Sequence, residues 1–222
     1  RSRRQRQMCI RDSIKEGYNM SNMPLMIDLQ SKKIVIVGGG KVATRRAKSL
    51  VEYCSHVHIV SPSITKELHT LFQQQRLTWA EKMFEPQDIS HAFLVIIATN
   101  QPEVNQHVKD SLPEGTLLNH AADASKGNVT FPSMLRRGKL TISVSTDGAS
   151  PKLGRQIIST LQDTYDERYE SYVDFLYESR QLIKASTIEP SRKQALLQHV
   201  LSEDYLDEEK QKEFKRWLQS QV

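Results

Sequence analysis

The sequence predicts an α/β protein in which a parallel sheet is followed by a small α+β region and then by a helical C-terminal region. Three observations support this order. A charge-free, β-branched run at residues 34–37 ends at three glycines and then continues with helical spacing. Strand-like and helix-like segments alternate as far as about residue 127, which is typical of a parallel sheet with helices on both faces. From residue 165 onward the apolar residues recur only at helical spacing.

The glycine-rich turn carries the clearest functional signal. Gly38 allows a tight turn after the strand, Gly40 lets the backbone approach a pyrophosphate, and Ala43 is small enough to keep the helix against the strand. The helix start also offers unpaired N–H groups to an anion. The pattern predicts a Rossmann-like domain that binds a dinucleotide; a plain glycine-rich connection is the alternative. The expected contacts are Gly38, Gly39, Gly40, Lys41 and Val42.

Four further strands and three helices are expected in this domain. The strands are expected at residues 57–60, 77–80, 93–98 and 116–118, and the helices at residues 42–51, 65–75 and 102–112. Ligands of such sheets bind at the carboxyl ends of the strands. The residues expected there, after the second and fourth strands, are Ser61, Pro62, Ser63, Thr99 and Asn100. For Thr99 and Asn100, a local role in ending the strand is an equally good interpretation.

The pattern changes near residue 128. Residues 129–132 and 140–145 alternate as strands do, and the basic segment 136–139 is expected to turn between them. Ser150 then has the position of a helix N-cap, with Pro151 as the first helical residue. These features predict a short hairpin followed by a helix.

The rest of the chain is predicted to be helical. A stripe of apolar and aromatic residues runs from about Tyr165 to Ile183, Glu189-Pro190 breaks it, and a last amphipathic helix follows. The stripe is interpreted as core or as a contact between subunits. The expected domains are residues 20–127 for dinucleotide binding, residues 128–164 for dimerisation and residues 165–222 for the helical domain.

Composition limits the classes of protein to which the chain can belong. A mean hydropathy of −0.53, with no apolar run near the roughly 20 residues that span a bilayer, argues against a membrane partner. The two cysteines, Cys9 and Cys54, form no CxxC pair, so a cytoplasmic protein without disulfides is the default. Residues 1–19 contribute +4 of the formal net charge of +5, so the basic balance does not indicate nucleic-acid binding. We expect those residues to be an appended or disordered tail.

Several segments occur together in an order that resembles one family. They are residues 38–46, residues 98–100, Asp123 with residues 131–133, and residues 143–151. Over roughly residues 23–185 the chain resembles precorrin-2 dehydrogenase, which also forms the N-terminal half of siroheme synthase. The resemblance implies NAD-dependent oxidation of a tetrapyrrole, precorrin-2, to sirohydrochlorin in siroheme biosynthesis. It also implies a homodimer.

Asp123 is the expected catalytic residue. By the resemblance it occupies the position of the family's essential aspartate, to which a general-base or proton-relay role is assigned. The chemistry needs such a group, because a hydride leaves to NAD⁺ while a proton leaves the macrocycle, and a carboxylate can accept that proton. The alternative is a loop aspartate that caps a turn.

The substrate carries many carboxylates, so the resemblance implies cationic and hydroxyl side chains around it. Arg45 and Arg46 lie in the first turns of a helix, where positive charge is unfavourable unless an anion faces it. The expected substrate contacts are Arg45, Arg46, His120, Ser145, Thr146 and Ser150. For the arginines and for His120, a solvated surface is the alternative interpretation.

The sequence departs from the usual patterns at two points. No Asp or Glu ends the second strand to hold the ribose hydroxyls, so NAD rather than NADP rests on the resemblance, with Ser61 and Ser63 as substitutes. His120 stands where some relatives are expected to have asparagine. The seven histidines show no metal-ligand spacing, so no metal site is expected.

The leading hypothesis is an NAD-dependent precorrin-2 dehydrogenase. Two alternatives stay open. One is a bifunctional enzyme that also inserts iron as a sirohydrochlorin ferrochelatase. The other is a non-catalytic NAD-sensing module, for which the sequence offers no DNA-binding element.

Overall fold

The computed structural model describes residues 22–221, so the predicted tail at residues 1–19 lies outside the described residues. The chain divides into two compact units between Thr130 and Phe131. Each unit has a hydrophobic core of its own.

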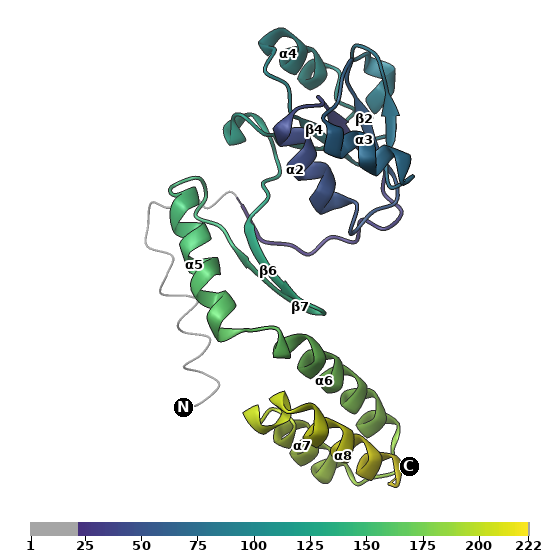
Figure 1. The fold of residues 1–222 in the computed structure, drawn as a ribbon, viewed down its shortest axis with the longest axis vertical. Helices are drawn as coiled ribbons and strands as arrows, with labels where there is room; N and C mark the ends of the chain where they lie inside the picture. The colour runs from purple at the N-terminus through teal and green to yellow at the C-terminus, as the bar shows by residue number, and fades with distance from the viewer. Residues whose placement is uncertain (1–21, 222) are drawn as a thin grey trace. The chain divides into compact units, whose positions relative to one another are not determined.

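The first unit contains a parallel sheet of five strands in the order β3-β2-β1-β4-β5. Figure 1 labels β2 and β4 of this sheet. The strands are β1 (Ile34–Val37), β2 (Val57–Val60), β3 (Thr78–Ala80), β4 (Leu94–Ile97) and β5 (Leu117–His120). Ile34 lies opposite Val57 on one side and Leu94 on the other, so β1 is central. The order reverses between β1 and β4, where a crevice opens at the carboxyl ends of the strands. The predicted Rossmann-like arrangement is confirmed.

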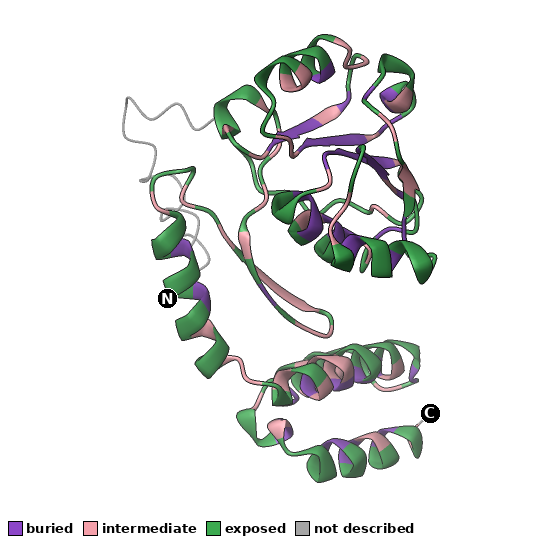
Figure 2. Cartoon of the chain, turned by 45° about the horizontal axis from the view of Figure 1, so that its top comes forward, coloured by how far each residue is buried: buried purple, intermediate pink, exposed green. Residues whose placement is uncertain are grey.

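The central strands are buried on both faces, which explains their continuous apolar sequence. All residues of β1 and β4 are buried, and Figure 2 shows the buried strands in purple. On one face, Val35 and Ile97 belong to a core cluster with Phe84, Ile89 and Val108. Burial of this apolar surface supplies the main driving force for folding the unit.

Helices lie on both sides of the sheet (Figure 2). They are α2 (Lys41–Leu50), α3 (Lys66–Gln73) and α4 (Pro102–Asp110), with a 3₁₀ helix, η1 (Pro86–Ile89), between β3 and β4. Ala43 and Ala47 of α2 are fully buried, so the helix approaches the sheet closely. Thr65 caps α3 by accepting a hydrogen bond from Leu68 N–H at 3.3 Å, and the helix begins one residue later than predicted.

The chain covers the outer edge of β5 with its own next segment. The side chain of Asn128 accepts from Leu118 N–H at 2.6 Å and donates to Thr116 O at 3.1 Å. The backbone N–H groups of Asn128 and Val129 both donate to Leu118 O. Edge groups of the sheet are thereby satisfied, as they must be where a strand has no neighbour.

The second unit begins with an antiparallel hairpin of β6 (Ser133–Arg137) and β7 (Leu140–Val144). The strand predicted at residues 129–132 is wrong, because Val129 is held beside β5 and Pro132 has no N–H for a ladder. The turn is also shorter than predicted, with Gly138 at a φ of +53°. Arg136 and Arg137 therefore belong to β6 rather than to the turn.

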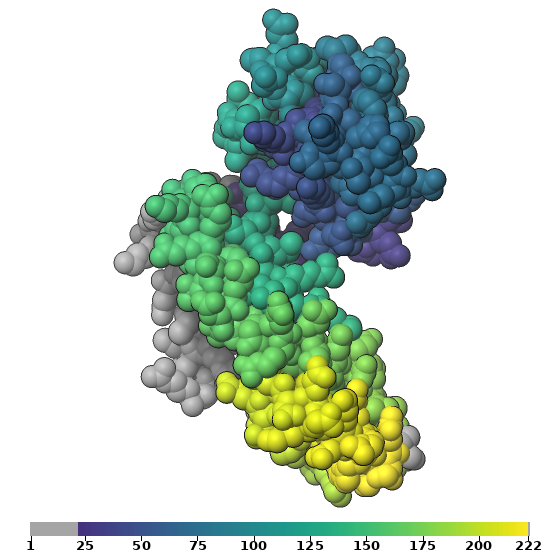
Figure 3. Space-filling view, in the orientation of Figure 1, coloured from purple at the N-terminus to yellow at the C-terminus, as the bar shows by residue number. Residues whose placement is uncertain are grey.

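The helices of the second unit follow the hairpin. They are α5 (Pro151–Thr164), α6 (Arg168–Ala185), α7 (Pro190–His199) and α8 (Glu208–Gln219), with a 3₁₀ helix, η3 (Glu203–Leu206), before the last. Ser150 caps α5 as predicted, by accepting from Leu153 N–H at 3.1 Å. Figure 3 shows α8, in yellow, at the surface. None of the helices at residues 22–221 is both long and apolar enough to span a bilayer.

An aromatic cluster forms the core of these last helices. Phe175 of α6 lies 5.1 Å from Tyr205 and 5.8 Å from Phe214, measured between ring centroids. Tyr172 donates its hydroxyl hydrogen to Val200 O at 3.1 Å. The predicted stripe therefore supplies core residues, with Tyr172 and Ile183 both buried.

Candidate functional site

A cavity of about 740 Å³ lies at the carboxyl edge of the sheet. The segments that follow β1, β2, β4 and β5 line it, at the crevice expected for this topology. All ten residues predicted to contact a cofactor are among the lining residues: Gly38, Gly39, Gly40, Lys41, Val42, Ser61, Pro62, Ser63, Thr99 and Asn100. The geometry thus brings the ten residues to one cavity.

The first two glycines allow contacts that no side chain permits. Gly38 has a φ of +119°, and a Cβ atom there would lie 2.5 Å from Ala98 O. A Cβ atom on Gly39 would lie 1.9 Å from Ser63 O and 2.9 Å from Ser61 Oγ. The backbone of the glycine turn therefore touches the segments after β4 and β2 directly.

Gly40 differs, because a Cβ atom there would meet nothing within 4 Å. Gly40 is the N-cap residue of α2, and no side chain caps this helix. The first turn of α2 also contains no acidic residue. An uncapped helix N-terminus offers its N–H groups and the positive end of its dipole to an anion.

The charge of the lining also suits an anionic ligand. Lys41 is the one charged residue among the described residues that line the cavity. The cavity therefore fits the pyrophosphate of a dinucleotide, which the backbone of Gly39, Gly40 and Lys41 would hold.

The end of β2 is tightly connected. Ser61 donates its hydroxyl hydrogen to Ser63 O at 2.8 Å, and Trp79 Nε1 donates to Ser61 O at 2.9 Å. The Ser61 hydroxyl therefore keeps only acceptor capacity for a ribose. The hydroxyl of Ser63, an exposed residue, is the better candidate donor.

Thr99 connects the end of β4 to α4. Its hydroxyl donates to Asn105 Oδ1 at 2.5 Å, and it accepts from Gln101 N–H at 3.1 Å. The local role that sequence left open for Thr99 is therefore present in the structure. What Thr99 offers to the cavity is mainly its backbone.

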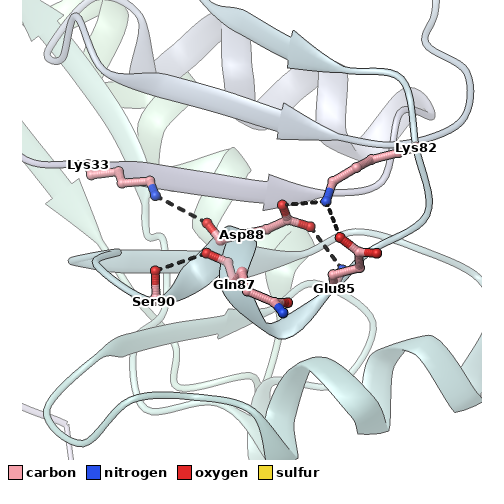
Figure 4. Close-up of polar contacts among 6 residues, drawn as sticks. All are labelled: Lys33, Lys82, Glu85, Gln87, Asp88 and Ser90. Atoms are coloured by element: carbon pink, nitrogen blue, oxygen red, sulfur yellow. Dashed lines mark hydrogen bonds and ion pairs between the residues drawn. The ribbon is translucent and has the colours of Figure 1, made fainter.

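The connection between β3 and β4 adds a wall that the sequence did not indicate. Met83 and Phe84 line the cavity, and a polar cluster holds the segment that carries them (Figure 4). Lys82 Nζ lies 2.6 Å from Glu85 and 2.9 Å from Asp88, and Glu85 N–H donates to Asp88. No motif marks this irregular segment, so sequence analysis missed it. The other lining residues that were not predicted as cofactor contacts are Val37, Val60, Ile64, Thr65, Ala98, Gln101, Val104, Ala121 and Ala122.

Asp123 lies one residue beyond the lining, since Ala121 and Ala122 complete the cavity wall after β5. It caps a 3₁₀ helix, η2 (Ala124–Lys126), by accepting from Ser125 N–H at 3.1 Å. Its backbone N–H donates to His120 Nδ1 at 3.1 Å, which puts the proton of a neutral ring on Nε2. His120 is buried. The cap predicted as the alternative role of Asp123 is therefore present, and the carboxylate also remains 40% exposed.

The surroundings of Asp123 favour its ionised form. The Ser125 hydroxyl donates to the carboxylate at 2.6 Å and is the main reason why the pKa of Asp123 lies below its usual value. Partial desolvation opposes this effect, while Ser125 N–H and the charge of Lys126 add to it. The carboxylate is consequently ionised at neutral pH and able to accept a proton.

The two arginines of α2 differ in their surroundings. Arg45 is exposed, whereas Arg46 is half-buried. Burial lowers the pKa of Arg46 from its usual value, and the nearby charge of Arg45 lowers it further. An anion beside this pair would stabilise both charges.

The remaining predicted substrate contacts lie in the second unit. Ser145 accepts from Asp147 N–H at 3.2 Å, and Thr146 accepts from Ser150 N–H at 3.0 Å. The hydroxyls thus shape the loop before α5. Within residues 22–221, no group of three or more His, Cys, Asp or Glu is arranged to hold a metal ion.

A second hollow, of about 620 Å³, lies between α6 and α8. It contains none of the predicted site residues, and its lysines are paired. Lys215 lies 2.9 Å from Glu178, and Lys212 lies 2.7 Å from Glu209. We therefore take the cavity at the sheet edge as the candidate functional site.

Three family models match the chain. One described as putative NAD(P)-binding matches residues 25–133. One for the central part of sirohaem biosynthesis proteins matches residues 137–157, and one for the SirC C-terminal domain matches residues 169–214.

Two relatives and one solved structure that are similar to this chain are all precorrin-2 dehydrogenases. The chain is 36% identical to precorrin-2 dehydrogenase of Priestia megaterium over 191 residues, which is 86% of this chain and 95% of that protein. It is 35% identical to precorrin-2 dehydrogenase of Bacillus subtilis over 158 residues, which is 71% of this chain and 98% of that protein. The solved structure of SirC, a precorrin-2 dehydrogenase, matches with a TM-score of 0.79 at 34% identity, covering 90% of this chain and 100% of that one.

The glycines of the turn provide a matched pair of substitutions. We expect Gly39→Ala to lower the free energy of unfolding by about 2 kcal/mol or more, because the new methyl group overlaps Ser63 O. Gly40→Ala should change that free energy by less than about 1 kcal/mol, since its methyl group meets open space. Gly40→Ala should nevertheless weaken dinucleotide binding, because the backbone of Gly40 is expected to hold the pyrophosphate. Urea denaturation measures the free energy of unfolding of the two variants, and titration measures their affinity for NAD. Equal losses of stability would contradict the separate roles of Gly39 and Gly40.

Proposed function

Since the chain belongs to the precorrin-2 dehydrogenase family, we propose that it oxidises precorrin-2 to sirohydrochlorin with NAD as the hydride acceptor. The observation that carries the proposal is the position of Asp123. It directly follows Ala121 and Ala122, which line the same cavity as the uncapped glycine turn. This position supports a carboxylate base and a dinucleotide site at one edge of one sheet.

The first step is binding of the cofactor. The N-terminus of α2 holds the pyrophosphate, and the segment after β2 receives the adenine ribose. NAD rather than NADP rests on the family, since the segment from Ser61 to Thr65 carries neither the acidic residue typical of NAD sites nor a cation, and Lys66 follows it directly. When bound, the nicotinamide ring supplies the site that accepts hydride.

Asp123 then removes the proton. The two hydrogens lost by precorrin-2 leave as one hydride and one proton, and the ionised carboxylate of Asp123 takes the proton. We propose that His120, Arg45 and Arg46 of the first unit bind carboxylates of the tetrapyrrole. Ser145, Thr146 and Ser150 remain predicted substrate contacts of the second unit.

We further propose that the enzyme is a homodimer joined through the hairpin and α5. A sheet of only two strands is marginal by itself. Met134 on β6 and both Leu153 and Ile157 on α5 are 41%, 47% and 37% exposed. A second copy of the chain would cover this apolar surface.

We propose a cytoplasmic location, which the state of Cys54 supports. This buried residue has a free thiol that donates to Lys32 O at 2.9 Å and accepts from His56 N–H at 3.2 Å. A thiol used in this way suits a reducing compartment.

The activity is tested by anaerobic turnover of precorrin-2 with NAD⁺, following NADH and sirohydrochlorin together. Both should appear in equal amounts. Asp123→Asn should lower kcat by about 100-fold or more, the usual range for loss of a general base, while NAD binding stays within about twofold. Normal turnover by Asp123→Asn would refute the assigned mechanism, and absence of NADH with the wild type would refute the activity.

The pH dependence tests the role of Asp123 separately. Because its pKa is lowered and the base must be ionised, the rate should fall only when pH drops below the usual range for an aspartate. Ser125→Ala removes the main cause of that shift, so the acid limb of kcat should move to higher pH. Ser90→Ala, which loses a hydroxyl bonded to Gln87 O, is the control and should leave the limb in place. If the acid limb of kcat stays in place in Ser125→Ala, a group other than Asp123 causes it.

The dimer is tested by Ile157→Glu. A buried, unpaired charge at the interface should shift the protein from dimer to monomer in sedimentation equilibrium, raising the dimer Kd by about 100-fold. Leu201→Glu, at an exposed site in the connection after α7, is the control. It should leave the molar mass measured by sedimentation equilibrium unchanged. A wild-type monomer would contradict the proposal.

A further inference from the structure

Two segments that line the cavity, the start of α2 and the segment after β2, meet at a pair of hydroxyl groups. Thr44 lies on α2, four residues after Gly40, and Thr65 ends the segment that follows β2. Their Oγ1 atoms are 2.7 Å apart. Thr44 is buried, and Thr65 lines the cavity.

The neighbours of the pair fix the direction of its hydrogen bonds. Thr44 donates its hydroxyl hydrogen to Gly40 O at 3.0 Å, so the hydrogen between the two hydroxyls comes from Thr65. Thr65 Oγ1 in turn accepts from Leu68 N–H. A hydrogen-bonded chain thus runs from the start of α3 through both threonines to the carbonyl group of Gly40.

A second contact joins the same segments at the backbone. Thr65 N–H donates to Gly39 O at 3.1 Å. Ser63 O occupies the space that a Cβ atom on Gly39 would need. The glycine turn and the segment after β2 are therefore in direct contact. At its other end, the segment after β2 is held by Trp79 through Ser61 O.

We propose that the Thr44–Thr65 pair is a positioning device for the cofactor, which sets the spacing between the pyrophosphate-binding turn and the ribose-binding segment. A dinucleotide must reach both at once, whereas adenosine touches only the second. Preorganising the two segments raises affinity because no ordering is left to the ligand. Neither threonine is assigned a part in the chemistry.

The inference rests on the dinucleotide site of the proposed function, and binding tests it without turnover. The chain has two tryptophans, Trp79 and Trp217. In a Trp217→Phe background, Trp79 reports on the segment after β2, to which it is hydrogen-bonded. NAD and adenosine are titrated separately against the full chain.

Thr44→Val removes both hydroxyl contacts at nearly constant volume and should raise the NAD Kd by about tenfold. The adenosine Kd should change by less than about twofold. Thr44→Ser keeps the hydroxyl and should bind NAD like the wild type. The control is Thr70→Val, which removes a similar bond to a helical carbonyl, that of Lys66, away from the cavity.

A double-mutant cycle separates the pair from a general loss of structure. Thr44→Val with Thr65→Val should weaken NAD binding by less than the sum of the two single effects, because the hydrogen bond between the two hydroxyls is broken by either substitution. Independent, additive losses would overturn the proposal, as would an unchanged NAD Kd in Thr44→Val. If Thr44→Val does not fold, Thr65→Ser against Thr65→Val gives the same comparison. Failure of the wild type to bind NAD would refute the proposed function instead.

Discussion

The direct backbone contact between the glycine turn and its two neighbouring strand ends is the constraint on which the candidate site depends. Gly38 lies against Ala98, and Gly39 lies against Ser63, at distances that exclude a Cβ atom. These contacts bring the ends of β1, β2 and β4 to one crevice. They also leave the N–H groups at the start of α2 without a side-chain cap, so that an anionic ligand can use them.

The position of Asp123 depends on a comparable arrangement at the edge of the sheet. On one side, its backbone N–H is bound by His120 at the end of β5. On the other side, the chain returns to β5 through Asn128, and a Cβ atom on Gly127 would lie 2.6 Å from Leu118 O. The loop between is therefore fixed at both ends, which holds Asp123 in place directly after the lining residue Ala122.

Local patterns in the sequence were sufficient for the fold and for the ten predicted cofactor contacts that line the cavity. The apolar run of β1, the glycines after it and the Ser150 cap each have a short-range physical cause, so each was predicted. The strand at residues 129–132 was wrong because alternation says nothing about pairing, and Val129 instead bonds to β5. Contacts such as Thr44 with Thr65, or the wall formed by Met83, join distant segments and leave no periodic signal.

The placement of charge is compatible with the proposed carboxylate base and the proposed anionic cofactor at one sheet edge. Among the described lining residues the only charge is the positive one of Lys41. Asp123 lies just beyond, where Ser125 and Lys126 stabilise its negative charge. A carboxylate inside the lining would repel the pyrophosphate and would itself gain a raised pKa from it. Hydrogen bonds from Ser125 keep the pKa of Asp123 low, and the N-terminus of α2 has no side-chain cap that would compete with an anion.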